Sequence, residues 1–139
     1  MLSHRGLVHN TLVAARRYRL EPKDRVLQFC SISFGVSVEE LFATWAVGGT
    51  VVLRHEDTPV LGPAWADWLR RQEISVLNLP TAYWQEWAQD LENNGQTVPE
   101  RVRLVVVGGD RALASARRRW GRVGGAGVEW LNAFGSAEV

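Results

Sequence analysis

The residues that could do chemistry begin with a paired-glycine turn in RLVVVGGDRAL, residues 103–113. A β-branched run leads into Gly108 and Gly109, and a helical pattern follows Asp110. Glycine lets backbone amides approach a ligand closely, and a helix N-terminus favours anions, so this turn could hold a phosphate. A carboxylate at Asp110 disfavours that reading, and Asp110 or Ser115 is better explained as a helix N-cap. The turn does not match G-x-G-x-x-G, which leaves a backbone wall against a flat ligand as the open alternative.

Metal ligands and nucleophiles are sparse. His4, His9 and His55 share no ligand spacing with one another or with Cys30, so we expect no transition-metal site. Glu138 could instead contact a magnesium ion that is held mainly by nucleotide phosphates. The sequence contains neither a G-x-S-x-G elbow nor a Walker-type loop, so a serine hydrolase and a P-loop enzyme are not supported.

Composition bounds the class of protein. The chain has 139 residues, of which 46% are hydrophobic and 22% charged, as expected of one globular domain. A net charge of +1 gives no reason to expect a nucleic-acid or membrane partner, and no apolar run approaches the roughly 20 residues that span a bilayer. A single cysteine excludes an intrachain disulfide and fits a cytoplasmic location.

The elements that must position these residues alternate between helix and strand. The patterns predict strands at 25–31, 50–53, 75–79, 103–107 and 128–132, and helices at 3–18, 36–46, 63–71, from 81 onward, and from 110 or 115 to 121. Such alternation implies βαβ crossovers and a mostly parallel β-sheet of the α/β class. The strands are apolar on both faces, which predicts that helices flank the sheet on both sides.

Apolar spacing predicts how the helices pack. In the helix at 36–46, one apolar stripe is formed by Val38, Leu41, Phe42 and Trp45. The tryptophans at 65 and 68, and those at 84 and 87, are three residues apart and favour core packing over a ligand cage. Cys30 lies in an apolar run and is interpreted as a buried small hydrophobe.

Four stretches, taken in order, resemble the central part of an adenylation domain of nonribosomal peptide synthetases. They are SHRGLVHN, SISFGVSVEELFATWAVGGTVVL, SVLNLPTAYW, and RLVVVGGDRAL followed by LNAFGSAEV. Such domains belong to the acyl-adenylate-forming superfamily, with the acyl-CoA synthetases and luciferases. The resemblance covers essentially all of residues 1–139 and implies a central fragment, a partial N-terminal subdomain. The family's phosphate loop would precede the chain, and its C-terminal domain with the catalytic lysine would follow.

The resemblance also implies a reaction. A carboxylic acid attacks the α-phosphate of Mg-ATP to give an acyl-adenylate, and the acyl group then passes to the phosphopantetheine thiol of a carrier protein. This chemistry depends on positioning and charge stabilisation around the phosphates. Because the phosphate loop and the lysine-bearing domain are missing, we expect the chain to be inactive alone.

The resemblance places an acyl pocket along the chain. FGVSVEELF matches the motif F-D-x-S-V-x-x-x-F, in which the aspartate pairs with the α-ammonium of an amino acid, but here that position is Gly35. Losing such a partner costs several kcal/mol, roughly 3–5, so either the substrate lacks an α-amino group or the site has decayed. Glu39 could meet a polar or basic substrate group, or lie on a solvated helix face, and one of Glu39 and Glu40 must face elsewhere. The other pocket positions are Val36, Asn78, Val106, Gly108 and Ala133, with small residues at the last two leaving room.

The nucleotide side carries the clearest departures from the family. The resemblance assigns Gly109, Asp110 and Arg111 to an adenine-side wall, and residues 132–138 to the motif N-x-Y-G-P-T-E. Within that motif, Asn132 and Gly135 are retained, and Phe134 keeps an aromatic ring for stacking. Ser136 replaces proline, and Ala137 replaces the threonine that meets phosphate. Glu138 keeps the magnesium-side carboxylate. A simple strand-end turn is the alternative for this stretch.

The residues also allow two other functions. A non-catalytic α/β interaction module would use exposed apolar surface and strand edges for self-association or docking. A stand-alone nucleotide-binding domain would use the turn after residue 107.

Overall fold

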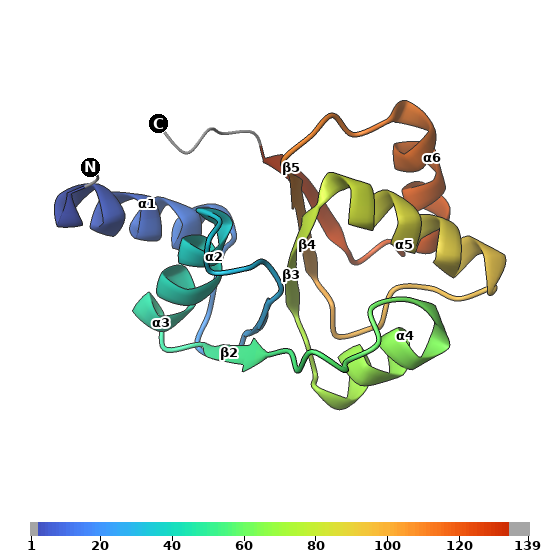
Figure 1. The fold of residues 1–139 in the computed structure, drawn as a ribbon, viewed down its shortest axis with the longest axis horizontal. Coiled ribbons are helices and arrows are strands. Elements are labelled where there is room, and N and C mark those ends of the chain that lie inside the picture. Colours follow the sequence, from blue (N-terminus) through green and yellow to red (C-terminus); the bar gives the residue numbers. More distant parts are fainter. Residues whose placement is uncertain (1–2, 134–139) are drawn as a thin grey trace.

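Five parallel strands form one sheet at the centre of the molecule (Figure 1). The computed structural model describes residues 3–133, and the predicted site residues Phe134, Gly135, Ala137 and Glu138 lie outside them. The strands are β1 (Arg25–Gln28), β2 (Thr50–Leu53), β3 (Val76–Pro80), β4 (Leu104–Gly108) and β5 (Glu129–Ala133), in the spatial order β2-β1-β3-β4-β5. The predicted α/β class with a parallel sheet is therefore confirmed.

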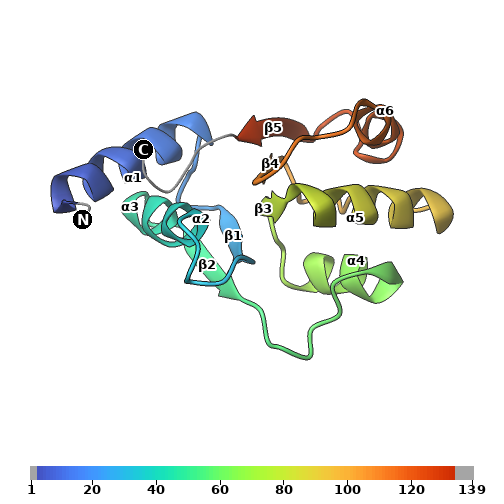
Figure 2. The same ribbon diagram turned by 45° about the horizontal axis from the view of Figure 1, so that its top comes forward.

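Helices cover both faces of the sheet, as the doubly apolar strands predicted (Figure 2). One face carries α1 (His4–Arg17) and a continuous helical stretch made of α2 (Val36–Val38), the π-helical turn η1 (Glu39–Ala43) and α3 (Thr44–Ala46). The opposite face carries α4 (Gly62–Arg71), α5 (Thr81–Asn93) and α6 (Ala114–Val123).

The strand order reverses between β1 and β3, and the sheet is loosest there. These two strands pair in register only at Val26 and Val76, whereas β3 and β4 pair at five positions from Val76–Leu104 to Pro80–Gly108. In open α/β sheets, ligands bind beyond the carboxyl ends of the strands at such a reversal point. A ligand is therefore expected beside β1, β3 and β4.

Alternate residues of each strand supply two separate cores. In β4, Val105 and Val107 face the core under α4, α5 and α6, whereas Leu104 and Val106 face the core under α1 and η1. The larger core holds the tryptophans: Trp65, Trp84 and Trp87 are fully buried, and the Trp68 ring stacks on Trp65 with centroids 5.4 Å apart. The prediction that these tryptophans pack rather than line a ligand cage is confirmed.

Strand β1 ends three residues earlier than predicted. The backbone N–H groups of Phe29 and Cys30 each donate to the Glu40 carboxylate at 3.2 Å, so they are not available to extend the strand ladder. Cys30 is half-buried, and burial raises the pKa of its thiol to about 12, which keeps it protonated and unreactive at neutral pH.

The predicted cap of α6 is wrong. The helix begins at Ala114 without a side-chain cap, because the Asp110 carboxylate accepts instead from the backbone N–H of Arg111 at 2.6 Å. Ser115 lies inside the first turn, and the Leu113 N–H donates to Gln85 of α5 at 3.3 Å. The helix also continues through Gly121 to Val123.

The predicted apolar face of the helix at 36–46 is also wrong. Phe42 and Trp45 are 40% and 56% exposed, whereas the buried side chains include Glu40 and Thr44. The π turn lies where Glu40 meets the end of β1, and the Thr44 hydroxyl donates to the Glu40 carbonyl at 2.7 Å. Because these polar groups find partners inside, the aromatic side chains of this stretch face outward.

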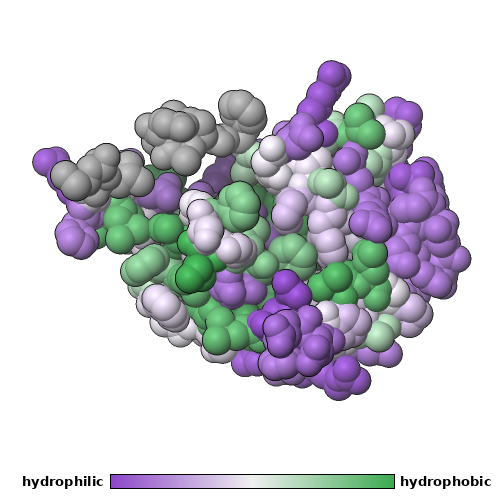
Figure 3. Space-filling model, viewed as in Figure 1, coloured by the Kyte–Doolittle hydropathy of each residue, from purple (hydrophilic) through white to green (hydrophobic). Residues whose placement is uncertain are grey.

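Hydrophobic side chains gather on the surface over α1 and the α2–α3 stretch, whereas the α6 side is mainly hydrophilic (Figure 3). The exposed members include Val8, Leu12 and Val13 of α1, together with Phe42 and Trp45. Within residues 3–133, no helix has the length and apolar character needed to cross a bilayer.

Candidate functional site

Three of the predicted pocket residues meet at one small cavity between the α1–η1 layer and the sheet. Glu39, Asn78 and Val106 line it, and it has room for about one water-sized group, ≈ 10 Å³. The remaining lining residues are Tyr18, Leu20, Val26, Glu40 and Val76. Asn78 and Val106 reach it together because they are register partners on neighbouring strands.

The two adjacent glutamates take different positions. Glu39 accepts a 2.5 Å hydrogen bond from the Tyr18 hydroxyl, and burial together with this carboxylate raises the pKa of Tyr18. Glu40 is only 1% exposed, and burial raises its pKa to about 7, although the hydrogen bonds from Cys30 and Phe29 oppose the rise. We expected one of the pair to face elsewhere, but both glutamates line the cavity, and the oxygens of Glu40 accept hydrogen bonds from the end of β1.

Asn78 is the polar side chain that the sheet presents to this cavity. It is 6% exposed, and no hydrogen bond joins its amide to another side chain or backbone group within residues 3–133. Buried amides normally have partners, and this one has none among residues 3–133, so the cavity offers a place for a polar group beside it.

Gly108 and Ala133 lie side by side at the carboxyl edge of the sheet, as paired residues of β4 and β5. A Cβ atom at position 108 would lie 2.9 Å from the Ala133 carbonyl oxygen. The glycine is therefore required by the close approach of β5. We expected its small size to leave room in a pocket, but the neighbouring backbone fills that space.

Gly35 and Val36 do not line this cavity. Gly35 precedes α2, is exposed, and has open space where a Cβ atom would project. Glu39 lies one turn further along the same helical stretch, so position 39, and not position 35, brings a carboxylate to the cavity.

The turn after β4 is held by a residue that the motif search missed. The Thr81 hydroxyl, 1% exposed, lies 3.0 Å from the carbonyl oxygens of both Gly108 and Asp110. Gly109 adopts φ = 88°, which favours glycine, and Asp110 and Arg111 are exposed. Thr81 follows Pro80 at a strand-to-helix junction, and that position was the available sequence signal.

The nucleotide-side residues are only partly described. Asn132 pairs with Val107 and is exposed at the end of β5, beside the turn that carries Gly109. The magnesium-side Glu138 lies outside the described residues. Within residues 3–133, no three His, Cys, Asp or Glu side chains gather as a metal site.

An ion pair that sequence reasoning missed fixes the end of α1 to the sheet. Arg103 donates to the buried Asp24 carboxylate at 2.5 and 2.9 Å, and also to the Tyr18 carbonyl at 3.2 Å. Burial opposes ionisation of Asp24, but the bonds from Arg103, Glu21 N–H and Ser75 hold its pKa below the usual range. This clasp holds the backbone of Tyr18, whose hydroxyl meets Glu39.

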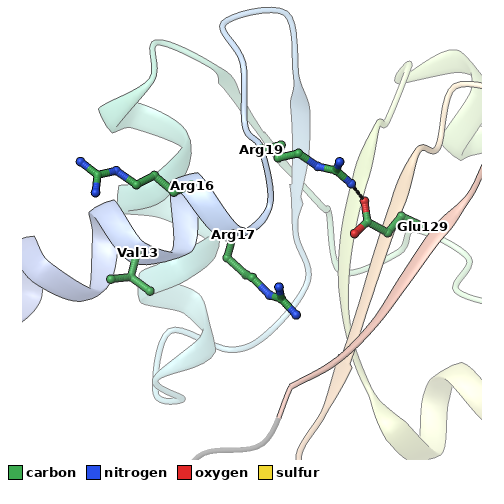
Figure 4. Close-up of a pocket in the computed structure, with 5 residues that line it drawn as sticks. All are labelled: Val13, Arg16, Arg17, Arg19 and Glu129. Carbon is green, nitrogen blue, oxygen red and sulfur yellow. Dashed lines mark hydrogen bonds and ion pairs between the residues drawn. The ribbon is translucent and has the colours of Figure 1, made fainter.

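A larger hollow of about 550 Å³ lies at the surface between the end of α1 and β5 (Figure 4). Its lining residues are Val13, Arg16, Arg17, Arg19 and Glu129. Arg19 forms an ion pair with Glu129, while Arg16 and Arg17 point in different directions. None of the predicted site residues that the structure describes lines this hollow.

Solved structures share this arrangement of sheet and helices. A crystal structure of a nonribosomal peptide synthetase matches 99% of this chain with a TM-score of 0.83 and 24% identity, and the match covers 15% of that chain. The Klebsiella oxytoca NpsA N-terminal subdomain, in complex with 3-hydroxyanthranilyl-AMSN, matches 98% with a TM-score of 0.79 and 20% identity, covering 33% of that chain. These matches show that the chain has the fold of such an N-terminal subdomain.

Sequence relatives identify the family. The isonitrile lipopeptide synthase of Streptomyces coeruleorubidus is 41% identical over 138 residues, which are 99% of this chain and 9% of the relative. The pyochelin synthetase of Pseudomonas aeruginosa is 33% identical over 122 residues, 88% of this chain and 7% of the relative. The profile of the AMP-binding enzyme family matches residues 1–139, and the chain belongs to that family, as its motifs predicted. It spans less than a tenth of these relatives' length.

Proposed function

We propose that this chain is the acyl-pocket and adenine-wall part of an ATP-dependent, carboxylate-adenylating domain. The observation that carries the proposal is the meeting of Glu39, Asn78 and Val106 at one cavity. These residues come from separate motifs of the adenylation-domain pattern, and only the folded sheet brings them together. The turn at 108–111 lies at the carboxyl end of the adjacent strand, where α/β sheets bind ligands.

In the proposed reaction, the substrate carboxylate attacks the α-phosphate of Mg-ATP, and pyrophosphate leaves as the acyl-adenylate forms. The cavity residues hold the acyl group, while the backbone of Gly109 to Arg111 and the exposed Asn132 flank the nucleotide. The acyl group then moves to the thiol of a carrier protein's phosphopantetheine arm. One structural neighbour is an artificially fused adenylation–carrier di-domain, which supports a carrier as partner.

ATP–pyrophosphate exchange tests the proposal. We expect none from the 139-residue chain alone, because the resemblance places the phosphate loop and catalytic lysine in other parts of the domain. A hybrid, in which the chain replaces the 138 aligned residues of the Streptomyces relative, should exchange in the presence of an acid. ATP binding by the hybrid without acid-dependent exchange would overturn the adenylating function, and exchange by the isolated chain would overturn its predicted inactivity.

An interaction module is the second candidate function. The exposed Phe42–Trp45 pair, with ring centroids 5.6 Å apart in an edge-to-face arrangement, favours it. Large exposed aromatic side chains often mark a surface that another protein covers.

A further inference from the structure

We propose that the cavity beside η1 receives a primary ammonium group of the substrate, with Glu39 as its counter-ion. This inference rests on the proposed function, because it names the class of carboxylic acid that the site would activate. The acid would carry a protonated amine that enters the cavity between Glu39 and Asn78.

The charges around the cavity favour a cation. Among residues 3–133, its lining contains two carboxyl groups, a phenol and an amide, but neither lysine nor arginine. None of the ion pairs formed within residues 3–133 includes Glu39 or Glu40. The nearby Arg17 lines the separate surface hollow and is exposed. A half-buried carboxylate without a cation gains more from a charged ligand than an exposed one, because water screens it less.

Glu39, and not Glu40, is the group that can bind the ligand. Both oxygens of Glu40 accept from the end of β1, through Phe29, Cys30 and the Gln28 side chain. Glu39 accepts the Tyr18 hydroxyl at one oxygen, Oε2, and Oε1 has no donor within the described part of the chain. One carboxylate oxygen is therefore open to a new donor.

Asn78 supplies the second, independent observation. Its side chain is more than nine-tenths buried, lines the cavity, and forms no hydrogen bond within residues 3–133. An ammonium group has three donors and no acceptor, so the Glu39 carboxylate and the Asn78 amide oxygen would satisfy two of them. The charged partner and the neutral partner thus come from opposite walls, η1 and β3.

The size of the cavity restricts the cation. The space of ≈ 10 Å³ accommodates one water-sized group, which suits the end of an alkylammonium chain. A planar guanidinium with five N–H donors is too large for it. We therefore expect discrimination between acids that end in an amine and acids that end in a guanidinium.

Ligand titration of the 139-residue chain tests the inference without requiring catalysis. The probes are 6-aminohexanoate and hexanoate, which differ only in the ammonium group, and the readout is the NMR signal of the Asn78 side-chain amide. We expect a saturable shift with 6-aminohexanoate alone. Equal shifts with both acids, or no shift with either, would overturn the proposal.

Two matched variants test whether the Glu39 carboxylate is the group that binds the ammonium. Glu39→Gln keeps the shape of the side chain and should weaken 6-aminohexanoate binding at least about tenfold. Glu86→Gln makes the same change on the exposed face of α5 and should leave binding unchanged. Unaltered binding in Glu39→Gln would contradict the role of Glu39 as counter-ion. If this variant folds poorly, the comparison of the two acids in the unsubstituted chain still tests the ammonium site.

The hybrid exchange assay separates this inference from the proposed function. Exchange that lysine and 6-aminohexanoate support, and that norleucine and hexanoate do not, agrees with both. Exchange with only norleucine and hexanoate, which lack the terminal ammonium group, keeps the adenylating function and overturns the ammonium pocket. A third outcome would reject adenylation and keep the ammonium site. In that outcome the hybrid binds ATP but shows no exchange with any of the four acids, while the isolated chain still binds 6-aminohexanoate at Asn78.

Discussion

Glu40 shows why two adjacent acids in a helical sequence do not reveal which of their side chains is buried. Two consecutive acids in FGVSVEELF predicted that one would face the pocket and one would face elsewhere, but both line the cavity. The pattern could not show that Glu40 would be buried, because its partners are backbone N–H groups of Phe29 and Cys30, which carry no side-chain signature.

The raised pKa of Glu40 predicts a pH-dependent stability. Its ordinary pKa of 4.5 rises to about 7 in the folded chain, so the folded state binds the proton more tightly than the unfolded state. The contribution of Glu40 to the free energy of unfolding should therefore be fully present below pH 4.5 and fall as pH rises toward 7, by up to about 3 kcal/mol. Urea unfolding at pH 5 and pH 7.5 measures the difference.

Substitution isolates the contribution of Glu40 to that pH dependence. Glu40→Gln cannot ionise, so the difference between pH 5 and pH 7.5 should shrink, although the amide also loses an acceptor for the end of β1. Glu86→Gln, on the exposed face of α5, should retain the full difference. An unchanged slope in Glu40→Gln would show that another group titrates.

Elements were easier to predict than contacts between them. The five strands and the helices that follow them were placed within a few residues, because hydrophobic periodicity and glycine or proline boundaries are local signals. The face of the helix at 36–46 was wrong, since Glu40 and Thr44 find buried partners that periodicity does not report. The same limit hid the Asp24–Arg103 clasp, whose residues are far apart in sequence.

Gly108 provides the test of how β4 and β5 meet. In Gly108→Ala, the new Cβ would lie 2.9 Å from the Ala133 carbonyl oxygen, and this atom belongs to backbone that must move. Overpacking of this kind costs about 1–3 kcal/mol. We expect a lower free energy of unfolding in urea and altered NMR shifts for β5 amides.

A second glycine in the same part of the chain controls for the general effect of added alanine. Gly121 lies inside α6, is exposed, and has open space for a Cβ atom. Gly121→Ala should stabilise the chain by roughly 0.5–1 kcal/mol, because alanine favours a helix interior. Equal effects of the two substitutions would contradict the close approach of β5 at position 108.

The candidate site becomes visible only at the scale of the whole molecule. Glu39, Asn78 and Val106 are spread over 68 positions of the sequence, and the parallel crossovers bring them to one cavity. Motif order predicted that they belong together, but neither the small size of the cavity nor the absence of Gly35 from it could be read from sequence. Those features depend on how η1 packs against β1, β3 and β4.

The apolar surface over α1 and α3 predicts that the isolated chain self-associates. Phe42 and Trp45 are 40% and 56% exposed and contact each other, and exposed Leu12 and Val13 extend the surface along α1. Light scattering after gel filtration should give a mass above 15.6 kDa that rises with concentration. Trp45→Ser should shift the distribution toward monomer, whereas Leu113→Ser, an equally exposed but separate apolar residue, should not. A concentration-independent monomer would contradict association through this surface and remove the support for an interaction module.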